Sequence, residues 1–558
     1  MTKLFEWAND PSRDFMSKGY LVEGETIEQR AADIAKAVGT YYTKASGFQL
    51  SGKQIEKKVY EYIGKGFYSL SSPFLSNAFV DRGLPISCNN VTIEDDMSDI
   101  IYKTAEVSRQ TQKGAGTSGY FGKIRPRGSP ISTGGKADGP VHYASLFETA
   151  TDVISQGSVR RGNFAAYLDV DHPDIMEFLE AREGDHYIQK LSLGVCISDD
   201  FMNRCMNMDP KANEILGRIQ KKRDETGYPY IFFSDTVNRN KPAHYKDYTI
   251  LGSNLCSEIC QPSTKDESFV CCLMSMNLAT IDEWFDTDAV EIALVMMDAV
   301  MEDYLNKIKD DPLMRTSYNS AKKWRAVGIG TLGYHTALQK LGYPFESEQA
   351  RRFNTFAHKT IWERLEKRTK ELAEIFGEPE GLKGTGRRNG TLTAIAPTTS
   401  SSFILGQVSP SIEPLAGNIV TKDLAKGKYT WKNPELEKVL ESYGKNDSET
   451  WASINDNYGS VQHLDYLSDN EKLIFKTFPE ISMREVVGQA ADRQKYLDQS
   501  QSLNLTFHPE TPVADTVAIM FEAWALGVKT LYYQRPFKNK AQATAKKLSE
   551  MYCTSCEA

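Results

Sequence analysis

The sequence predicts an α/β fold in which one large domain follows a short helical N-terminal region. Strand-like and helical segments alternate from about residue 67 to residue 537, and no Pro-, Gly- or Ser-rich linker interrupts them. The chain shows no internal repeat and no coiled-coil heptad. Of its 558 residues 40% are hydrophobic and 25% are charged, a globular composition that excludes wholesale disorder.

The elements are expected in the following order. Residues 1–66 are predicted to be helical, with an amphipathic helix from Ile27 that ends at Gly39 as a C-cap. Short apolar runs with small-residue loops begin at Phe67, and long helices are predicted at 288–305 and 349–376. The polar, lysine-rich end predicts a flexible tail. The chain therefore divides into residues 1–66, 67–537 and 538–558.

Charge and hydropathy limit the class of protein. Lys and Arg number 66 against 74 Asp and Glu, so the net charge of −8 argues against a basic nucleic-acid surface. No run of 18 apolar residues and no signal peptide is present, which predicts a cytoplasmic protein with neither a membrane nor a nucleic-acid partner. In that compartment the nine cysteines are expected to be thiols rather than structural disulfides.

The glycine-rich run Gly114–Gly119 fits the G-x-G-x-x-G dinucleotide fingerprint, but its context is wrong. That fingerprint follows a buried strand, whereas residues 107–113 are polar and are typical of a helix end. A dinucleotide-dependent oxidoreductase therefore remains only a remote alternative.

The segment Asn254–Glu258 (NLCSE) is the most informative in the chain. If it is extended, alternation places the amide of Asn254, the thiol of Cys256 and the carboxyl of Glu258 on one face. By itself the pentapeptide is better explained by a surface strand with an accidental cysteine. Further cysteines lie in other apolar runs and in a C-terminal C-x-x-C, however, and this pattern suggests dithiol redox chemistry at an internal site. These cysteines are Cys88, Cys271, Cys553 and Cys556.

With these residues in place, the chain resembles the catalytic large subunit of ribonucleotide reductase. The NLCSE segment resembles the active-site finger loop of that family, and further motifs follow in the same order, at residues 157–162, 386–392, 396–402, 412–414, 498–504 and 529–533. The resemblance implies a ten-stranded α/β barrel with the finger loop in its centre. It also implies the reduction of ribonucleotides, with diphosphates as the expected form, to 2′-deoxyribonucleotides.

The resemblance assigns catalytic roles to five residues. Cys256 would carry a thiyl radical that removes the 3′-hydrogen, Glu258 would accept the 3′-hydroxyl proton, and Asn254 would orient the sugar hydroxyls. Cys88 and Cys271 would supply two electrons and close to a disulfide. Counting back from Asn277 without gaps selects Cys271, but the neighbouring Cys272, on the other face of a strand, remains an alternative.

The resemblance also implies two nucleotide sites. Small hydroxyls and backbone amides can bind a diphosphate without large charged side chains. The expected substrate-binding residues are Ser72, Ser87, Pro397, Thr398, Thr399, Ser400 and Ser401. Asp95, Arg125 and Arg160 fall at the specificity loops, where an ATP or dNTP effector would bind across a homodimer interface.

The radical source is expected outside this chain. Tyr532 and Tyr533 resemble the tyrosine pair that relays the oxidising equivalent from a metal-containing small subunit, and no metal site or bound cofactor is predicted in this chain. A cobalamin-dependent enzyme is the alternative. Cys553 and Cys556 are predicted to shuttle electrons from thioredoxin or glutaredoxin. Only 87 residues precede Cys88, so we expect a minimal form without an N-terminal ATP-cone.

Overall fold

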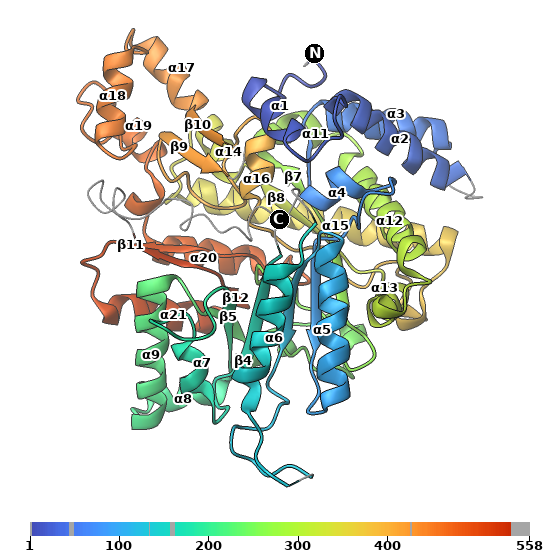
Figure 1. The fold of residues 1–558 in the computed structure, drawn as a ribbon. Coiled ribbons are helices and arrows are strands. Elements are labelled where there is room, and N and C mark those ends of the chain that lie inside the picture. Colours follow the sequence, from blue (N-terminus) through green and yellow to red (C-terminus); the bar gives the residue numbers. More distant parts are fainter. Residues whose placement is uncertain (1–2, 44–48, 133, 157–161, 425–426, 537–558) are drawn as a thin grey trace.

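The computed structural model describes residues 3–43, 49–132, 134–156, 162–424 and 427–536 (Figure 1). Strands and helices alternate through most of this range, as the sequence predicts. The strands are β1 (Tyr68–Leu70), β2 (Cys88–Thr92), β3 (Gly116–Tyr120), β4 (Phe164–Asp169), β5 (Ser192–Ile197), β6 (Tyr230–Phe233), β7 (Phe269–Asn277), β8 (Val327–Leu332), β9 (Ile419–Leu424), β10 (Gly427–Lys432), β11 (Leu505–Phe507), β12 (Thr530–Leu531) and β13 (Gln534–Pro536). The helices are α1 (Asp10–Ser17), α2 (Ile27–Thr43), α3 (Gly52–Gly64), α4 (Ser72–Asn77), α5 (Met97–Gln112), α6 (Gly139–Val153), α7 (Ile175–Glu180), α8 (Asp199–Met206), α9 (Pro210–Thr226), α10 (Ser234–Arg239), α11 (Ile281–Trp284), α12 (Ala289–Ile308), α13 (Arg315–Trp324), α14 (Tyr334–Lys340), α15 (Glu348–Phe376), α16 (Thr399–Ile404), α17 (Pro434–Ser442), α18 (Ser448–Asp456), α19 (Asp469–Ile474), α20 (Met483–Gln494) and α21 (Val513–Ala525).

The main sheet is mixed and curled. Among the described residues it has nine strands in the order β1-β7-β2-β3-β4-β5-β6-β12, with β8 paired to β7. Strands β2 to β6 are parallel to their neighbours, whereas β7 is antiparallel to β2, and β12 is antiparallel to β6. β7 is buried along its whole length, and its apolar sequence FVCCLM is typical of a strand covered on both faces.

Backbone hydrogen bonds continue the sheet beyond β8. They join β8 to residues 391–392, residue 395 to residues 500–502, and residues 503–505 to residues 532–533. The bonds are Val327 N to Thr391 O (3.1 Å), Ile329 N to Leu392 O (2.8 Å), Ile395 N to Ser500 O (3.1 Å), Ser502 N to Ile395 O (2.9 Å), Tyr532 N to Leu503 O (2.9 Å) and Leu505 N to Tyr533 O (2.9 Å). The two ends of the sheet are thereby drawn toward each other, and the curl encloses the segment that carries Cys256.

Helices pack around the outside of this sheet, and Figure 1 shows α5 and α6 lying side by side along it. α5 packs on β2 and β3, and α12 packs on β7 and β8. A buried ion pair helps to hold α5, since Lys103 Nζ lies 3.2 Å from Glu106 Oε2 and both side chains have 0% exposure. Ser268, which precedes β7, donates to Glu106 and accepts from Lys103, both at 3.1 Å.

The N-terminal helices α1 to α3 share the main hydrophobic core with the sheet. The prediction that the second helix ends at Gly39 is wrong, because α2 continues to Thr43. Gly39 is needed for helix packing instead, since a Cβ atom there would lie 2.5 Å from Gly52 O on α3. The predicted boundaries at residues 66/67 and 537/538 stay predictions, and residues 537–558 lie outside the described range.

The long segment between α16 and α20 forms a small unit with its own core. Its elements are the β9–β10 hairpin and helices α17 to α19, and Leu436, Trp451 and Leu464 belong to its separate hydrophobic cluster.

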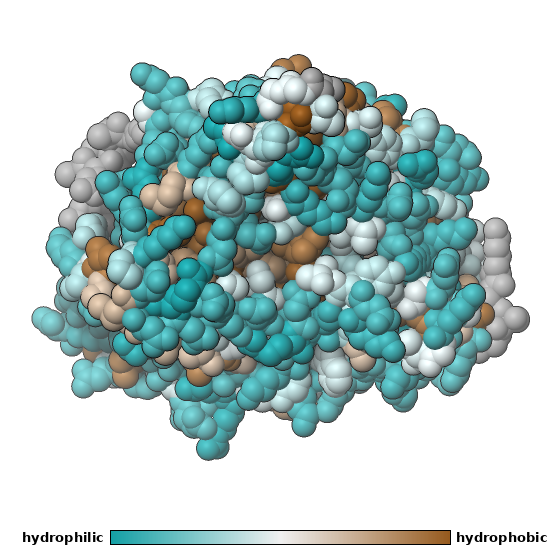
Figure 2. All heavy atoms as spheres, turned by 90° about the horizontal axis from the view of Figure 1, so that it is seen from below, coloured by the Kyte–Doolittle hydropathy of each residue, from teal (hydrophilic) through white to brown (hydrophobic). Residues whose placement is uncertain are grey.

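Hydrophilic side chains cover most of the molecular face in Figure 2, with hydrophobic patches near its centre. In the described part of the chain no helix has the length and apolarity needed to cross a membrane.

Candidate active site

The segment from residue 251 to residue 262 crosses the inside of the curled sheet without forming a strand. Its carbonyl groups are held from both sides, which satisfies the hydrogen-bonding needs of a buried backbone. Ser118 Oγ donates to Ser253 O (2.8 Å), Asn90 Nδ2 to Ser253 O (3.0 Å), Tyr167 OH to Asn254 O (2.8 Å), Thr530 Oγ1 to Ser257 O (2.8 Å), and Ser500 N to Glu258 O (2.8 Å). Strands from opposite sides of the sheet therefore fix this loop.

The loop turns sharply at its centre. Leu255 and Cys256 lie in a turn, and Ser257 has a left-handed backbone with φ of 69°. The prediction of an extended segment with three side chains on one face is therefore wrong. Asn254 and Glu258 both contact Cys88, whereas Cys256 belongs to a cluster of buried aromatic side chains on the other side of the loop.

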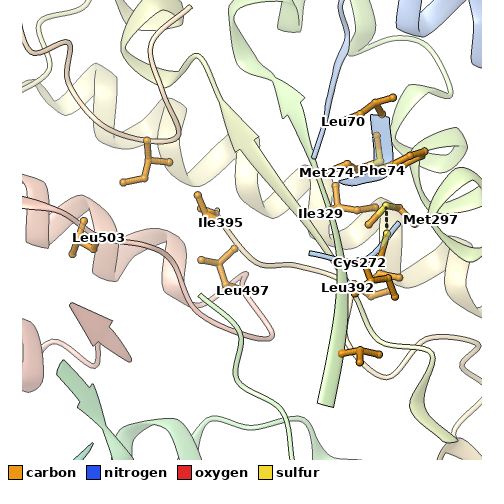
Figure 3. Packing of buried hydrophobic residues seen from close by; sticks show 14 of the residues in the cluster. Leu70, Phe74, Cys272, Met274, Met297, Ile329, Leu392, Ile395, Leu497 and Leu503 are labelled. Carbon is orange, nitrogen blue, oxygen red and sulfur yellow. Dashed lines mark hydrogen bonds between the residues drawn. The ribbon is translucent and has the colours of Figure 1, made fainter. Parts of the chain in front are cut away.

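The strand register places Cys88 opposite Cys271. The two are Cα partners in the antiparallel pairing of β2 with β7. Directly opposed residues have Cα atoms about 4.5–5.5 Å apart, which is within the range of about 4.4–6.8 Å that a disulfide needs. The neighbouring Cys272 points to the other face of β7, where its Sγ lies 3.7 Å from Met297 Sδ on α12 (Figure 3).

Each sulfur of the pair accepts a hydrogen bond from a carboxamide. Asn254 Nδ2 donates to Cys88 Sγ at 3.1 Å, and Gln499 Nε2 donates to Cys271 Sγ at 3.5 Å. The oxygens of both amides are fixed by backbone N–H groups, that of Asn254 by Ile259 N (3.1 Å) and that of Gln499 by Cys260 N (3.2 Å). This pattern fixes which end of each amide faces the sulfur.

Glu258 lies beside this pair and is only 1% exposed. Its Oε1 accepts from Cys88 Sγ at 3.7 Å, and its Oε2 accepts from Ser502 Oγ at 3.1 Å. Burial raises the pKa of Glu258 to about 7, because water no longer stabilises the carboxylate. The group is thus poised to take and return a proton near neutral pH.

Ser502 and Gln499 were not identified from the sequence as site residues. Ser502 Oγ also donates to Cys256 O, at 2.6 Å, so it links Cys256 to Glu258. Both residues lie in the motif at 498–504, so the sequence marked this segment, but it did not indicate what either residue does. Their contacts depend on the closure of the sheet, which the sequence does not show.

Tyr532 and Tyr533 lie in the short segment between β12 and β13, where strand alternation is interrupted. Their ring centroids are 4.3 Å apart, with an angle of 57° between the planes. Tyr532 is fully buried and Tyr533 is 7% exposed, and both belong to the cluster that contains Cys256. A third ring, that of Tyr230, lies 4.6 Å from Tyr532 and 5.1 Å from Tyr533.

The expected substrate residues lie at chain segments close to these thiols. Ser72 begins α4, and Ser87 Oγ accepts from Cys88 Sγ at 3.7 Å. Pro397 is buried just before α16, Thr398 is the N-cap of that helix with φ of 49°, and Thr399, Ser400 and Ser401 form its first turn. α16 contacts β1, which directly precedes Ser72.

Among the described residues, four buried hydroxyls in this region have no hydrogen-bond partner, those of Ser71, Ser72, Ser400 and Ser411. Such groups normally find a partner, and a polar ligand can supply it.

Two of the expected effector residues form an ion pair. Arg125 Nε lies 2.6 Å from Asp95 Oδ2, and both side chains are partly exposed. Asp95 lies just before α5, and Arg125 lies in the segment between β3 and α6. Arg160, Cys553 and Cys556 lie outside the described residues. The glycine-rich run Gly114–Gly119 begins just after α5 and continues into β3, so a helix precedes it and the run itself enters a strand. This order is the reverse of a dinucleotide-binding turn and removes that alternative.

Comparisons with known proteins agree with this geometry. The chain matches the family described as "Ribonucleotide reductase, barrel domain" over residues 86–210, 206–384 and 378–534. It is similar in structure to the class Id ribonucleotide reductase alpha subunit of Actinobacillus ureae, with a TM-score of 0.90, 45% identity, and coverage of 96% of this chain and 99% of that one. A putative ribonucleoside-diphosphate reductase large subunit of Frog virus 3 is 36% identical, covering 94% of this chain and 96% of that protein. The large subunit of Invertebrate iridescent virus 3 is 33% identical, covering 97% of each.

Proposed function

The chain belongs to the class I ribonucleotide reductase large subunits, which reduce ribonucleoside diphosphates to deoxyribonucleotides, and we propose that its reaction uses a thiyl radical at Cys256. The observation that carries the proposal is the fixed loop in which Ser502 links Cys256 to Glu258, while Glu258 contacts Cys88, the thiol that faces Cys271 across the β2–β7 pair. Class I enzymes take the radical from a separate small subunit, so the cobalamin-dependent alternative is set aside.

The proposed chemistry begins at the sugar. The Cys256 thiyl radical removes the 3′-hydrogen, which makes the neighbouring 2′-oxygen a better leaving group. Glu258 accepts the 3′-hydroxyl proton, and its raised pKa suits that task. Asn254 orients the sugar hydroxyls.

The thiol pair completes the reduction. The 2′-oxygen leaves as water with one proton from the pair, and Cys88 and Cys271 are oxidised to one disulfide, which supplies the two electrons. The second proton of the pair goes to C2′, and Glu258 returns its proton to the 3′-oxygen. Cys256 then returns a hydrogen atom to C3′ and recovers the radical. The register of β2 with β7 supports Cys271 over Cys272 as the partner of Cys88.

The scaffold we propose is a ten-stranded barrel. β2 to β6, β7, β8 and β12 supply eight strands, and the hydrogen-bonded segments 391–395 and 499–505 supply two more. The loop that carries Cys256 would then be its central finger. In support, polar side chains of β2, β3, β4 and β12 all bond to this loop.

Tyr532 and Tyr533 are proposed to carry the oxidising equivalent from the small subunit to Cys256. Their contacting rings support this role, because short steps between aromatic side chains favour transfer. The neighbouring residues Ser502 and Leu503 connect Cys256 to the tyrosine pair. Ser502 Oγ donates to Cys256 O, and Leu503 O accepts from Tyr532 N.

The substrate diphosphate is proposed to bind the unpartnered hydroxyls near α4 and α16. The proposed binding residues are Ser72, Ser87, Pro397, Thr398, Thr399, Ser400 and Ser401, and of these Ser72 and Ser400 have unpartnered hydroxyls. Asp95, Arg125 and Arg160 are proposed to bind an ATP or dNTP effector next to the interface of a homodimer. Exposed apolar side chains on the adjacent helices α5 and α6 support that interface, namely Met97, Ile101, Leu146 and Val153.

Re-reduction is proposed to use Cys553 and Cys556 as carriers of electrons from thioredoxin or glutaredoxin. Cys88 and Cys271 are 6% and 0% exposed, so a protein reductant cannot reach them directly. Tethered thiols act at an effective concentration around millimolar.

One experiment tests the thiol assignments together. Pre-reduced protein is mixed with the small subunit and a ribonucleoside diphosphate without external reductant, and disulfides are mapped by mass spectrometry. We expect deoxynucleotide and a Cys88–Cys271 disulfide in a chain that also carries Cys553→Ser and Cys556→Ser. Cys272→Ala should behave like its parent, whereas Cys271→Ala should lose the disulfide. Product formed together with a different disulfide would overturn the assignment.

A further inference from the structure

A third tyrosine contacts the proposed relay from its outer side. The phenol oxygens of Tyr228 and Tyr533 lie 3.1 Å apart, in hydrogen-bond contact, and their ring centroids are 5.2 Å apart at an angle of 72°. The identified motifs do not include Tyr228, and the role proposed for Tyr532 and Tyr533 does not use it.

The backbone builds this contact. Tyr228 lies between α9 and β6, directly after Gly227, whose φ of 82° suits glycine. Gln534 N, next to Tyr533, donates to Gly227 O at 3.3 Å. A Cβ atom at Gly227 would lie 3.3 Å from the ring of Tyr533, so the two chain segments approach closely.

The two phenols differ in their exposure. Tyr533 is buried, with 7% of its surface exposed, whereas Tyr228 is partly exposed. Of the two hydrogen-bonded rings, Tyr228 is therefore the one that a protein docked on the surface can approach.

A fixed positive charge lies over the Tyr228 ring. Arg182 Cζ is 4.6 Å from the ring centroid, and Arg182 Nη1 donates to Leu191 O at 2.9 Å, which holds the guanidinium in place. A cation stabilises an electron-rich ring. Removal of an electron alone, with the phenol proton left on Tyr228, would give a positively charged ring beside this cation, and the cation opposes that step. Electron and proton must therefore leave together, and the hydrogen bond to Tyr533 gives the hydrogen a path.

We propose that Tyr228 is a further relay residue that exchanges a hydrogen atom with Tyr533; this rests on the proposed role of Tyr532 and Tyr533. In the step, the phenoxyl radical of Tyr228 takes the hydrogen atom of Tyr533. An O–H bond forms on Tyr228, an O–H bond breaks on Tyr533, and the radical moves inward. A radical of the small subunit first takes the hydrogen atom of Tyr228, and the inward order of oxidation is Tyr228, Tyr533, Tyr532, Cys256.

The test replaces single tyrosines of the full chain by 3-aminotyrosine, which is oxidised more easily than tyrosine and traps a radical. Each protein is mixed with the small subunit, a ribonucleoside diphosphate and a dNTP effector, and the radical is measured by electron paramagnetic resonance. Substitution at Tyr228 should give an aminotyrosyl radical, as should substitution at Tyr533. The matched control is Tyr443, an exposed tyrosine whose phenol donates to Glu471 at 2.9 Å, and it should give none.

The outcomes separate this proposal from the relay itself. A radical at position 533 without one at position 228 overturns the role of Tyr228 alone. The absence of a radical at both positions overturns the proposed Tyr532–Tyr533 relay.

A second variant excludes a merely structural role for Tyr228. Loss of one positioning hydrogen bond is worth about 0.5–1.5 kcal/mol, or at most about tenfold in rate. Tyr228→Phe should lower turnover by clearly more than this and leave nucleotide affinity unchanged, while Tyr443→Phe keeps full turnover. A loss of tenfold or less in Tyr228→Phe overturns the proposal.

Discussion

Cys88 and Cys271 face each other across the antiparallel pair β2 and β7, although 183 positions separate them in the sequence. Each sulfur accepts a hydrogen bond from a fixed amide, and Cys88 also contacts Glu258. Two thiols, a carboxyl group and two amides thus share one enclosed site, and this grouping leads to the following predictions.

Cys256→Ser should abolish deoxynucleotide formation and leave nucleotide affinity largely unchanged. An O–H bond is too strong to take the place of the S–H bond as the radical carrier. Product formation and equilibrium binding of a ribonucleoside diphosphate are measured side by side. Substantial residual turnover would contradict the radical role of Cys256.

The pH dependence of kcat/KM should have a limb with a pKa near 7 that belongs to Glu258. Burial raises this pKa to about 7, and the base must be ionised, so the rate should fall as the pH drops below 7 and reach a plateau above it. Glu258→Gln should lose about 10²–10⁴-fold in rate and lose this limb as well. An unchanged pH profile in the variant would assign the limb to another group.

Gln499→Met should slow the re-reduction of the Cys88–Cys271 disulfide by a small dithiol. Burial raises the pKa of Cys271 to about 12, and the Gln499 amide lowers it, so the variant loses a group that stabilises the leaving thiolate. The loss should be roughly tenfold, the value of about one hydrogen bond. Stopped-flow measurement of thiol release checks this prediction, and an equal rate in the variant would rule out the contact.

The double variant Cys553→Ser with Cys556→Ser should complete about one turnover and then stall when thioredoxin is the reductant. The reason is the burial of Cys88 and Cys271, which only a thin carrier can reach. A small dithiol should restore part of the turnover. Multiple turnover with thioredoxin at the normal rate would show that another route carries the electrons.

Lys103→Met should lower the free energy of unfolding by about 3–5 kcal/mol, because it leaves Glu106 buried without its cation. Lys103→Met with Glu106→Leu should recover most of that loss. The control is Lys53→Met, which breaks a pair of the same spacing on α3 whose lysine is 85% exposed, and it should change stability by no more than about 1 kcal/mol. Urea unfolding measures all three, and equal effects at positions 103 and 53 would contradict the prediction.

The sequence predicted elements whose signal is local. The helix expected at 349–376 is α15, Glu348–Phe376, because its amphipathic spacing runs without a break. The prediction that α2 ends at Gly39 was wrong, because this glycine allows α2 to pack closely against α3 and does not end the helix. That contact joins two helices and leaves no mark in the periodicity of either.

Residues that meet at the candidate site were named from the sequence, but their geometry was not predictable from it. The turn at Ser257 overrides the alternation expected for Asn254, Cys256 and Glu258. The contact between the adjacent rings of Tyr532 and Tyr533 likewise depends on the gap between β12 and β13. Gln499 and Ser502 acquire their contacts only when residues far apart in the chain close the sheet.

The pairing of β12 with β6 has a consequence for the newly made chain. The last residue of β6, Phe233, and the first of β12, Thr530, are 297 positions apart. At about 5–20 residues per second, roughly 15–60 s pass on the ribosome between these strands. Until then the sheet is open along that edge, and Cys88, Cys256 and Cys271 are within reach of dissolved oxidants. The yield of active protein should therefore depend on reducing conditions during translation far more than on those applied after folding.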